Sequence, residues 1–220
     1  MGENTGKARV VEVPAERVPG WFDRFADRHS GVVRTALTPD QVVVTATDGA
    51  TATVSVPFPP LDVEPGERSG LDVRVLVAHL AIPRRVGLIL VRLGGHSVGV
   101  AAAGKVVRSR TDRHHVHGRS AAGGWSQQRF ARRRDGQARQ ALAAAADDVA
   151  EVLGPLVGEL DAVVLGGDRH ALDTLRADRR LAPVLALARA RVLDVPEPRR
   201  TVLDEAAERA FAVEIAVLDP

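Results

Sequence analysis

Val86-Gly87-Leu88-Ile89-Leu90-Val91-Arg92 is the stretch that decides the fold of this chain. Its almost continuous apolar character is typical of a strand that is buried on both faces, as in the middle of an α/β sheet. Two further strands are predicted at residues 97–103 and 105–110, because Gly94-Gly95 and Gly104 turn the chain ahead of each. Together the three segments predict an antiparallel three-stranded meander.

Helical and strand patterns alternate after the meander. Apolar residues and alanines recur at helical intervals over residues 127–153, and Gly154-Pro155 ends that pattern. This long helix is basic in its first turns and acidic in its last. The elements predicted after it are a buried strand at 162–165, helices near 169–177 and 181–188, a strand at 191–195 and a final helix from Thr201. The alternation predicts an α/β body with a mixed β-sheet flanked by helices.

A smaller α+β lobe is predicted ahead of this body. Residues 14–29 carry three aromatic side chains at helical spacing among charged residues, which predicts a short amphipathic helix with its aromatics in the core. Residues 41–47 and 51–56 are rich in β-branched side chains, and Asp48-Gly49 between them is a strong hairpin signal.

A proline- and glycine-rich connection follows the hairpin and extends to Gly70. We therefore place the boundary between the two parts near residue 70. Residues 1–70 form the predicted N-terminal lobe, and residues 71–220 form the predicted body.

The distribution of charge indicates a polyanionic partner. The whole chain has a net charge of +2, but residues 105–139 hold ten basic and two acidic side chains, so this segment is +8 and the remainder is −6. Such asymmetry is typical of a nucleic-acid-binding surface. The chain has no cysteine, which excludes disulfides, thiolate metal sites and a cysteine nucleophile. It shows no signal-peptide pattern and no membrane-length apolar run, so we expect a cytoplasmic protein without a membrane partner.

The basic segment surrounds a glycine- and glutamine-containing loop, residues 117–134, which reads HGRSAAGGWSQQRFARRR. Gly123 and Gly124 lack a Cβ, so their backbone can enter a narrow, phosphate-lined space. A glutamine amide has no useful pKa, so it can orient a water molecule or bind a developing charge but cannot act as a general base. The arginines expected to bind RNA phosphates are Arg119, Arg129, Arg132, Arg133 and Arg134.

These residues resemble the middle domain of eukaryotic and archaeal class I peptide release factors. The motifs His117-Gly118-Arg119, Gly-Gly with Gln, and Arg129-Phe130-Ala131-Arg132 occur in the same order as in that domain. Release factors place Gln directly after the two glycines, whereas this chain has Gly124-Trp125-Ser126-Gln127. That Gly-x-x-Gln spacing is similar to the Vms-like release-factor-related peptidyl-tRNA hydrolases, and the whole loop with its arginine run resembles their actinobacterial branch. The resemblance to the release-factor domain covers roughly residues 85 to 217.

The resemblance implies a release-factor middle-domain-like fold for the body and a role in ribosome rescue and quality control. The implied reaction is hydrolysis of the ester bond of peptidyl-tRNA on a stalled large ribosomal subunit, with the loop inserted into the peptidyl-transferase centre of the rRNA. Gly123 and Gly124 would allow insertion, and Gln127 would orient the attacking water, with Gln128 as the other candidate. No cofactor, metal or DNA partner is implied. The chain has no room for a codon-recognition domain, so stop-codon reading is not expected.

Other readings of the sequence remain open. A non-catalytic ribosome- or RNA-binding adaptor would need the arginines but neither glutamine. A tRNA 3′-end nuclease would use the histidines at 114, 115 and 117, since histidine exchanges protons near neutral pH. The same histidines could bind a metal, but no nearby carboxylate pair completes a site. Gly166-Gly167-Asp168 is interpreted as a strand-to-helix turn rather than a nucleotide-binding loop, because the full glycine spacing is missing.

Overall fold

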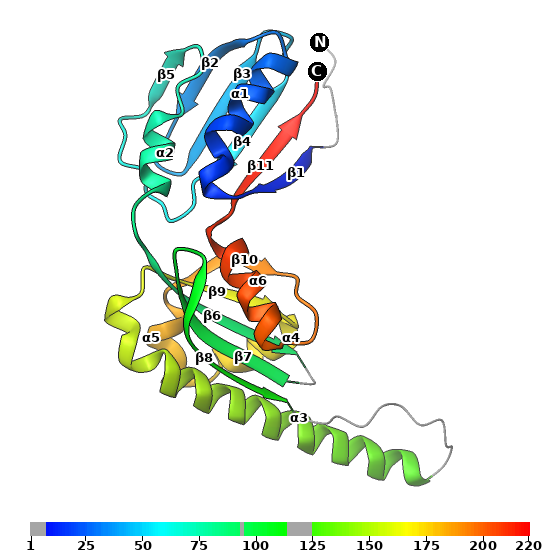
Figure 1. The fold of residues 1–220 in the computed structure, drawn as a ribbon. Helices are drawn as coiled ribbons and strands as arrows, with labels where there is room; N and C mark the ends of the chain where they lie inside the picture. Colours follow the sequence, from blue (N-terminus) through cyan, green and yellow to red (C-terminus); the bar gives the residue numbers. More distant parts are fainter. Residues whose placement is uncertain (1–7, 93–94, 114–124) are drawn as a thin grey trace. The chain divides into compact units, whose positions relative to one another are not determined.

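The computed structural model describes residues 8–92, 95–113 and 125–220, and for residues 113 and 125–135 it describes the backbone alone. The chain forms two compact units, drawn in Figure 1. Unit 1 comprises Met1–Pro83 and Phe211–Pro220, and unit 2 comprises Arg84–Ala210. The chain therefore divides after Pro83, not near residue 70, and it returns to unit 1 at its C-terminal end.

Unit 1 is an antiparallel sheet with helices on one face. The strand order is β1-β11-β4-β3-β2-β5, and every neighbouring pair is antiparallel. Its strands are β1 (Arg9–Val13), β2 (Val32–Leu37), β3 (Gln41–Ala46), β4 (Thr51–Ser55), β5 (Gly66–Ser69) and β11 (Val213–Leu218). Helices α1 (Val18–Arg28) and α2 (Arg74–Leu80) cross the same face of the sheet (Figure 1). The prediction that the N-terminal part of the chain is an α+β unit is therefore confirmed.

The core of unit 1 follows from residue alternation along the strands. In β3, β4 and β11, buried and more exposed residues alternate, so every second side chain of each strand packs in the core beneath the helices. Phe22 and Phe25 of α1 and Leu76 of α2 are buried in this core. The predicted hairpin is confirmed: Gly49 has a φ of +96°, and the Asp48 carboxylate accepts a hydrogen bond from the backbone N–H of Ala50.

Four strands of unit 1 lie where the sequence analysis predicted none: β1, β2, β5 and β11. The connection that leads to Gly70 contains β5, whose four residues are polar or glycine and therefore carry no hydrophobic pattern. The final helix is followed by β11, which pairs with β1 on one side and β4 on the other. Both pairings join segments that are distant in the sequence. The helix α2 also belongs to unit 1, because Leu76 packs in its core, and this moves the boundary beyond residue 70.

Unit 2 is a five-stranded mixed sheet with helices on both faces, as predicted. Its order is β10-β9-β6-β7-β8, with β10, β9 and β6 parallel and β6, β7 and β8 antiparallel. The strands are β6 (Arg85–Arg92), β7 (Gly95–Ala102), β8 (Lys105–Arg113), β9 (Ala162–Gly167) and β10 (Ala188–Leu193). The helices are α3 (Trp125–Val152), α4 (Arg169–Arg176), α5 (Ala182–Leu185) and α6 (Arg200–Phe211). The predicted meander corresponds to β6, β7 and β8.

The two faces of this sheet are covered by different helices. Ile89, Val91 and Val98 belong to one buried cluster with residues of α3 and α4. On the opposite face, Leu203 of α6 packs so closely on Gly99 that a Cβ at Gly99 would lie 3.0 Å from its Cδ2 and 2.7 Å from the carbonyl oxygen of Arg108. Glycine at position 99 is therefore required for α6 to pack on the sheet.

Several predicted boundaries in unit 2 differ from the structure. The helix expected at 181–188 is a 3-10 turn (Arg179–Leu181) followed by the four-residue α5. The chain then enters β10 earlier than expected, at Ala188 rather than residue 191. The long helix begins at Trp125, two residues before the expected start, and a 3-10 segment (Gly154–Glu159) follows it at the predicted Gly154-Pro155 stop.

Candidate functional site

The predicted tip is flanked by two well-defined elements, β8 and α3. Arg119, Gly123 and Gly124 lie outside the described residues, as do the three histidines at 114, 115 and 117. Gln127 and Gln128 lie in the first turn of α3, and the predicted RNA-binding arginines from 129 onward lie in the same helix. The structure thus places both candidate glutamines on a helix rather than in the loop before it.

The first turn of α3 has chemistry that suits a negatively charged ligand. The first four N–H groups of an α-helix, counted from its N-cap, have no acceptor within the helix, and among the described residues these belong to Trp125, Ser126 and Gln127. They also lie at the end of the helix where the peptide dipoles leave a partial positive charge. A phosphate or a developing oxyanion near Gln127 and Gln128 would therefore be stabilised by the backbone alone.

Helical geometry determines the angular position of each predicted site residue around the axis of α3. Successive residues are about 100° apart, so three of the arginines fall within an arc of about 100°, which we call the arginine face. The arginine face is defined by Arg129, Arg132 and Arg133. Gln128 lies next to this face, about 40° from Arg132, whereas Gln127 lies on the other side, about 20° from Arg134. The two glutamine positions therefore lie on different sides of the helix axis.

The charges of α3 oppose the helix dipole at both ends. Residues 125–140 contain five arginines and one acid, Asp135, whereas residues 141–152 contain three acids and no base. Cations are favoured at a helix C-terminus and anions at an N-terminus, so this order is unfavourable for an isolated helix. At each end of α3, a group of opposite charge is therefore needed to offset the unfavourable electrostatic energy.

The acidic end of α3 is compensated by arginines of unit 2. Asp147 pairs with Arg180 (2.8 Å), and Asp148 pairs with Arg110 of β8 (2.8 Å). Arg110 also contacts both carboxylate oxygens of Glu151. These hydrogen bonds, first to Glu151 and then to Asp148, raise the pKa of Arg110 above its usual range. Hydrogen bonds to Asp178, and then to Asp147, likewise raise the pKa of Arg180 above its usual range. The predicted acidic turns thus have a structural role, and the basic end is the part of α3 that suits an external anion.

A buried histidine adds to this polar contact. His96 of β7, with 1% of its side chain exposed, donates from Nε2 to Oδ2 of Asp148 over 2.8 Å. Sequence reasoning did not identify His96, Arg110 or Asp148. Two acids three residues apart on a helix, Asp148 and Glu151, were visible in the sequence, but their basic partner depends on the register between strand and helix.

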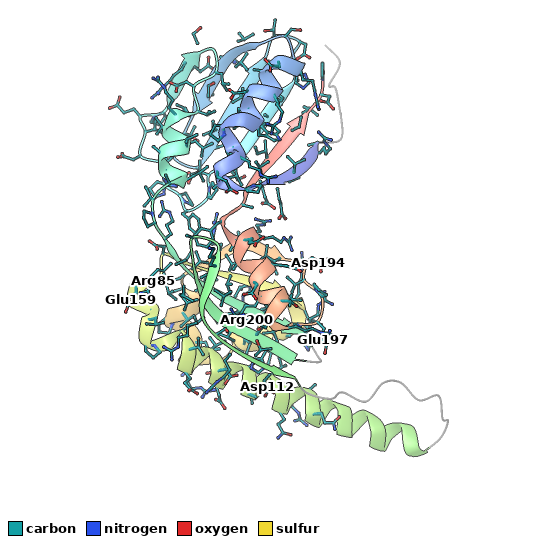
Figure 2. The ribbon with its side chains drawn as sticks, in the orientation of Figure 1. Arg85, Asp112, Glu159, Asp194, Glu197 and Arg200 are labelled. Carbon is teal, nitrogen blue, oxygen red and sulfur yellow. The ribbon has the colours of Figure 1, made fainter. Side chains whose placement is uncertain are left out.

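Strand β8 forms the other side of the tip. It is one of the two edge strands of the described sheet, and it exposes Lys105 and Arg108. Asp112 lies near its end, and Arg200 of α6 donates to the Ser109 hydroxyl of β8 (3.2 Å); both charged residues are labelled in Figure 2. The strand that leads to the tip is therefore tied to α3 by Arg110 and to α6 by Ser109.

The strand-to-helix turn at Gly166-Gly167-Asp168 is not an open anion site. Gly167 has a φ of +103°, and a Cβ there would lie 2.1 Å from the carbonyl oxygen of Val91. The Asp168 side chain accepts hydrogen bonds from the N–H groups of His170 and Ala171, so it caps the N-terminus of α4 itself. The interpretation as a plain strand-to-helix turn is confirmed.

In the part of the chain that the structure describes, no three histidine or carboxylate side chains come together in a group that could hold a metal ion. None of the helices in that part combines the length and the apolar composition that crossing a bilayer demands.

Comparison with known proteins gives one family match. The sequence matches the family model described as Actinobacteria/chloroflexi VLRF1 release factor over residues 84–216. This range is nearly the one over which the sequence resembled release-factor-related hydrolases, and it begins at the first residue of unit 2. No curated protein matches the chain.

Several solved structures resemble this one at low sequence identity. The archaeal translation termination factor aRF1 is 10% identical, with 90% of this chain and 73% of that chain covered and a TM-score of 0.43. Archaeoglobus fulgidus Pelota is 11% identical, with 95% and 64% covered and a TM-score of 0.35. S. cerevisiae Dom34, described as a translation termination-like factor, is 9% identical, with 93% and 65% covered and a TM-score of 0.35.

Proposed function

The chain belongs to the family of Actinobacteria/chloroflexi VLRF1 release factors, and we propose that it is a peptidyl-tRNA hydrolase. It releases nascent peptide from peptidyl-tRNA on stalled large ribosomal subunits. Its partners in this role are the large subunit, the rRNA around the peptidyl-transferase centre, and the peptidyl-tRNA itself.

The observation that carries the proposal is the charge arrangement of α3. Its acidic end is paired within unit 2, whereas its basic end adds arginines to the positive end of the helix dipole. Arg129, Arg132 and Arg133 also repel one another at i, i+3 and i+4 spacing in the free protein, and an RNA backbone at the arginine face offsets this repulsion. Arg119 before the two glycines and Arg134 after the glutamines add two further positive charges to this part of the sequence.

The proposed reaction adds water across the ester bond. The water oxygen forms a new bond to the peptide carbonyl carbon, the bond from that carbon to the ribose oxygen breaks, and one water proton ends on the ribose oxygen. A glutamine amide supplies no proton in this reaction; it orients the water and hydrogen-bonds the charge that develops on the carbonyl oxygen. Gly123 and Gly124 let the backbone approach closely enough for that contact.

We assign different roles to Gln127 and Gln128. The Gly-x-x-Gln spacing supports Gln127 as the water-orienting residue, and helical spacing supports an RNA contact for Gln128, whose position is next to those of the arginine face. In our proposal Gln127 orients the water, and Gln128 contacts RNA with the arginines.

The test is single-turnover release of peptide from peptidyl-tRNA on purified large subunits, with analysis of the tRNA product. Removing one hydrogen bond to a developing charge costs about 10²–10³ in rate, so Gln127→Ala should lower release by that factor while subunit binding persists. Ser126→Ala, in the same turn, is the matched control and should retain release. Full release by both Gln127→Ala and Gln128→Ala would exclude a water-orienting glutamine. A shortened tRNA would identify a 3′-end nuclease, and binding without either product would identify an adaptor.

A further inference from the structure

A four-residue polar cluster joins the two elements that flank the tip. His96 of β7 and Arg110 of β8 both donate to the carboxylate of Asp148 on α3, each over 2.8 Å, and they use different oxygens of it. Arg110 also bridges to Glu151, one helical turn further along α3. We call these four residues the α3 clamp: His96, Arg110, Asp148 and Glu151.

Two residues of the α3 clamp, His96 and Asp148, are largely shielded from water. His96 is buried, and the Asp148 side chain is 14% exposed, whereas Glu151 is on the surface. A carboxylate that accepts two hydrogen bonds, one from a guanidinium, holds its partners in a narrow range of directions. An ion pair of this kind contributes orientation more than stability.

The apolar contacts of α3 do not by themselves specify hydrogen-bond directions. Its described buried residues are alanines and valines, including Ala145, Ala146 and Val149, and Leu142 packs against the same cluster. Burial of such side chains is non-directional, because its free energy depends on the area removed from water. The clamp supplies the directional contacts that these residues lack.

Small tilts at the clamp become large displacements at the tip. Asp148 and Gln127 are separated by 21 positions of one continuous helix. At 1.5 Å per residue this is about 32 Å, so a tilt of about 2° at Asp148 moves Gln127 by about 1 Å. A misplacement of about 1 Å can lower a rate about 100-fold.

We propose that the α3 clamp sets the direction of α3 and thereby positions the tip for reaction. The four residues are positioning residues: they contact one another and act on the reaction through the helix. The inference rests on the proposed function for its effect on rate, but its effect on helix direction holds for the protein alone.

The decisive experiment measures the direction of α3 without a ribosome. The chain has no native cysteine, so spin labels at Ala131→Cys on α3 and Glu205→Cys on the exposed side of α6 report one distance distribution. Asp148→Asn exchanges one carboxylate oxygen for an amide that cannot accept from both donors. We expect this variant, and the surface variant Glu151→Gln to a smaller extent, to shift or broaden the distribution.

A matched control lies next to the clamp. Asp147→Asn makes the same chemical change one residue away, in an exposed ion pair with Arg180, and should leave the distribution unchanged. Distributions of Asp148→Asn and Glu151→Gln that equal those of the wild type and Asp147→Asn would overturn the proposal.

Release kinetics then test the consequence for the reaction. We expect Asp148→Asn to lower the single-turnover release rate 10- to 100-fold, with subunit affinity within about twofold of wild type, because the arginine face is intact. A loss of affinity equal to the loss of rate would contradict a positioning role. If the wild type itself releases no peptide, the proposed function fails, and the distance measurement still decides whether the clamp directs α3.

Discussion

Replacing the arginine face with alanine should change the salt dependence of RNA binding by a predictable amount. The triple variant Arg129→Ala, Arg132→Ala, Arg133→Ala removes three charges that α3 gathers within about 100° of its axis. Each phosphate contact contributes about 0.7–0.9 to the slope of log affinity against log salt concentration, so three contacts should lower the slope by about 2–2.7. Between 50 and 200 mM salt the advantage of the wild type over the variant should therefore shrink about 16- to 40-fold.

The assay is titration of labelled protein with purified large ribosomal subunits at several salt concentrations. The charge-matched control is Arg24→Ala, Arg28→Ala, Arg34→Ala, which removes three exposed arginines of unit 1. Arg134→Ala, on the far side of the helix from the arginine face, should lower the slope by less than one contact. An arginine-face variant whose slope equals that of the unit 1 control would refute the assignment of RNA contacts to this face.

Two predictions concern unit 1. Ile215→Ala removes three carbons from a fully buried side chain of β11, at about 0.8 kcal/mol per carbon plus a cavity cost, so it should destabilise unit 1 by about 3–4 kcal/mol. Hydrogen exchange should speed up in β1 and β4, its neighbours in the sheet, while β6 and β9 keep their protection; faster exchange confined to unit 2 would show that the C-terminal strand belongs elsewhere. Hydrogen bonds from Arg74 and then Arg68 hold the pKa of Asp72 well below its usual 3.8, so this carboxylate stabilises the fold above that pH and loses its effect as the pH falls below it. Thermal unfolding, followed by Trp21 fluorescence in a Trp125→Phe background, should therefore lose more stability below pH 3.8 in the wild type than in Asp72→Asn, and equal losses would contradict the linkage.

The elements predicted correctly are those specified by neighbouring residues. Asp48-Gly49 turns one hairpin, Gly104 turns another at a φ of +73°, and Gly154-Pro155 follows the end of α3, because the backbone preferences of these residues act within a few positions. The apolar run at 86–92 was likewise correctly predicted to form a buried strand. The order of basic and acidic residues along α3 could also be read directly.

The features that were missed depend on contacts between distant parts of the chain. β11 alternates apolar and less apolar residues, but its place between β1 and β4 joins segments more than 150 residues apart. The boundary after Pro83 follows from that return of the chain, and from the packing of Leu76 in unit 1. A boundary inferred from proline and glycine content alone could not include either contact.

For the candidate site, the sequence by itself determined the identities and spacing of the tip residues, the reversal of charge along α3 and the resemblance to release-factor-related hydrolases. These follow from residue type and order, which do not depend on folding. Only the tertiary structure decided that Arg110 and His96 meet at Asp148, and that both glutamines start a helix anchored about 30 Å away. The physical reason is that strand register and helix packing are set by the whole sheet, so a contact between β7, β8 and α3 has no local signature in the sequence.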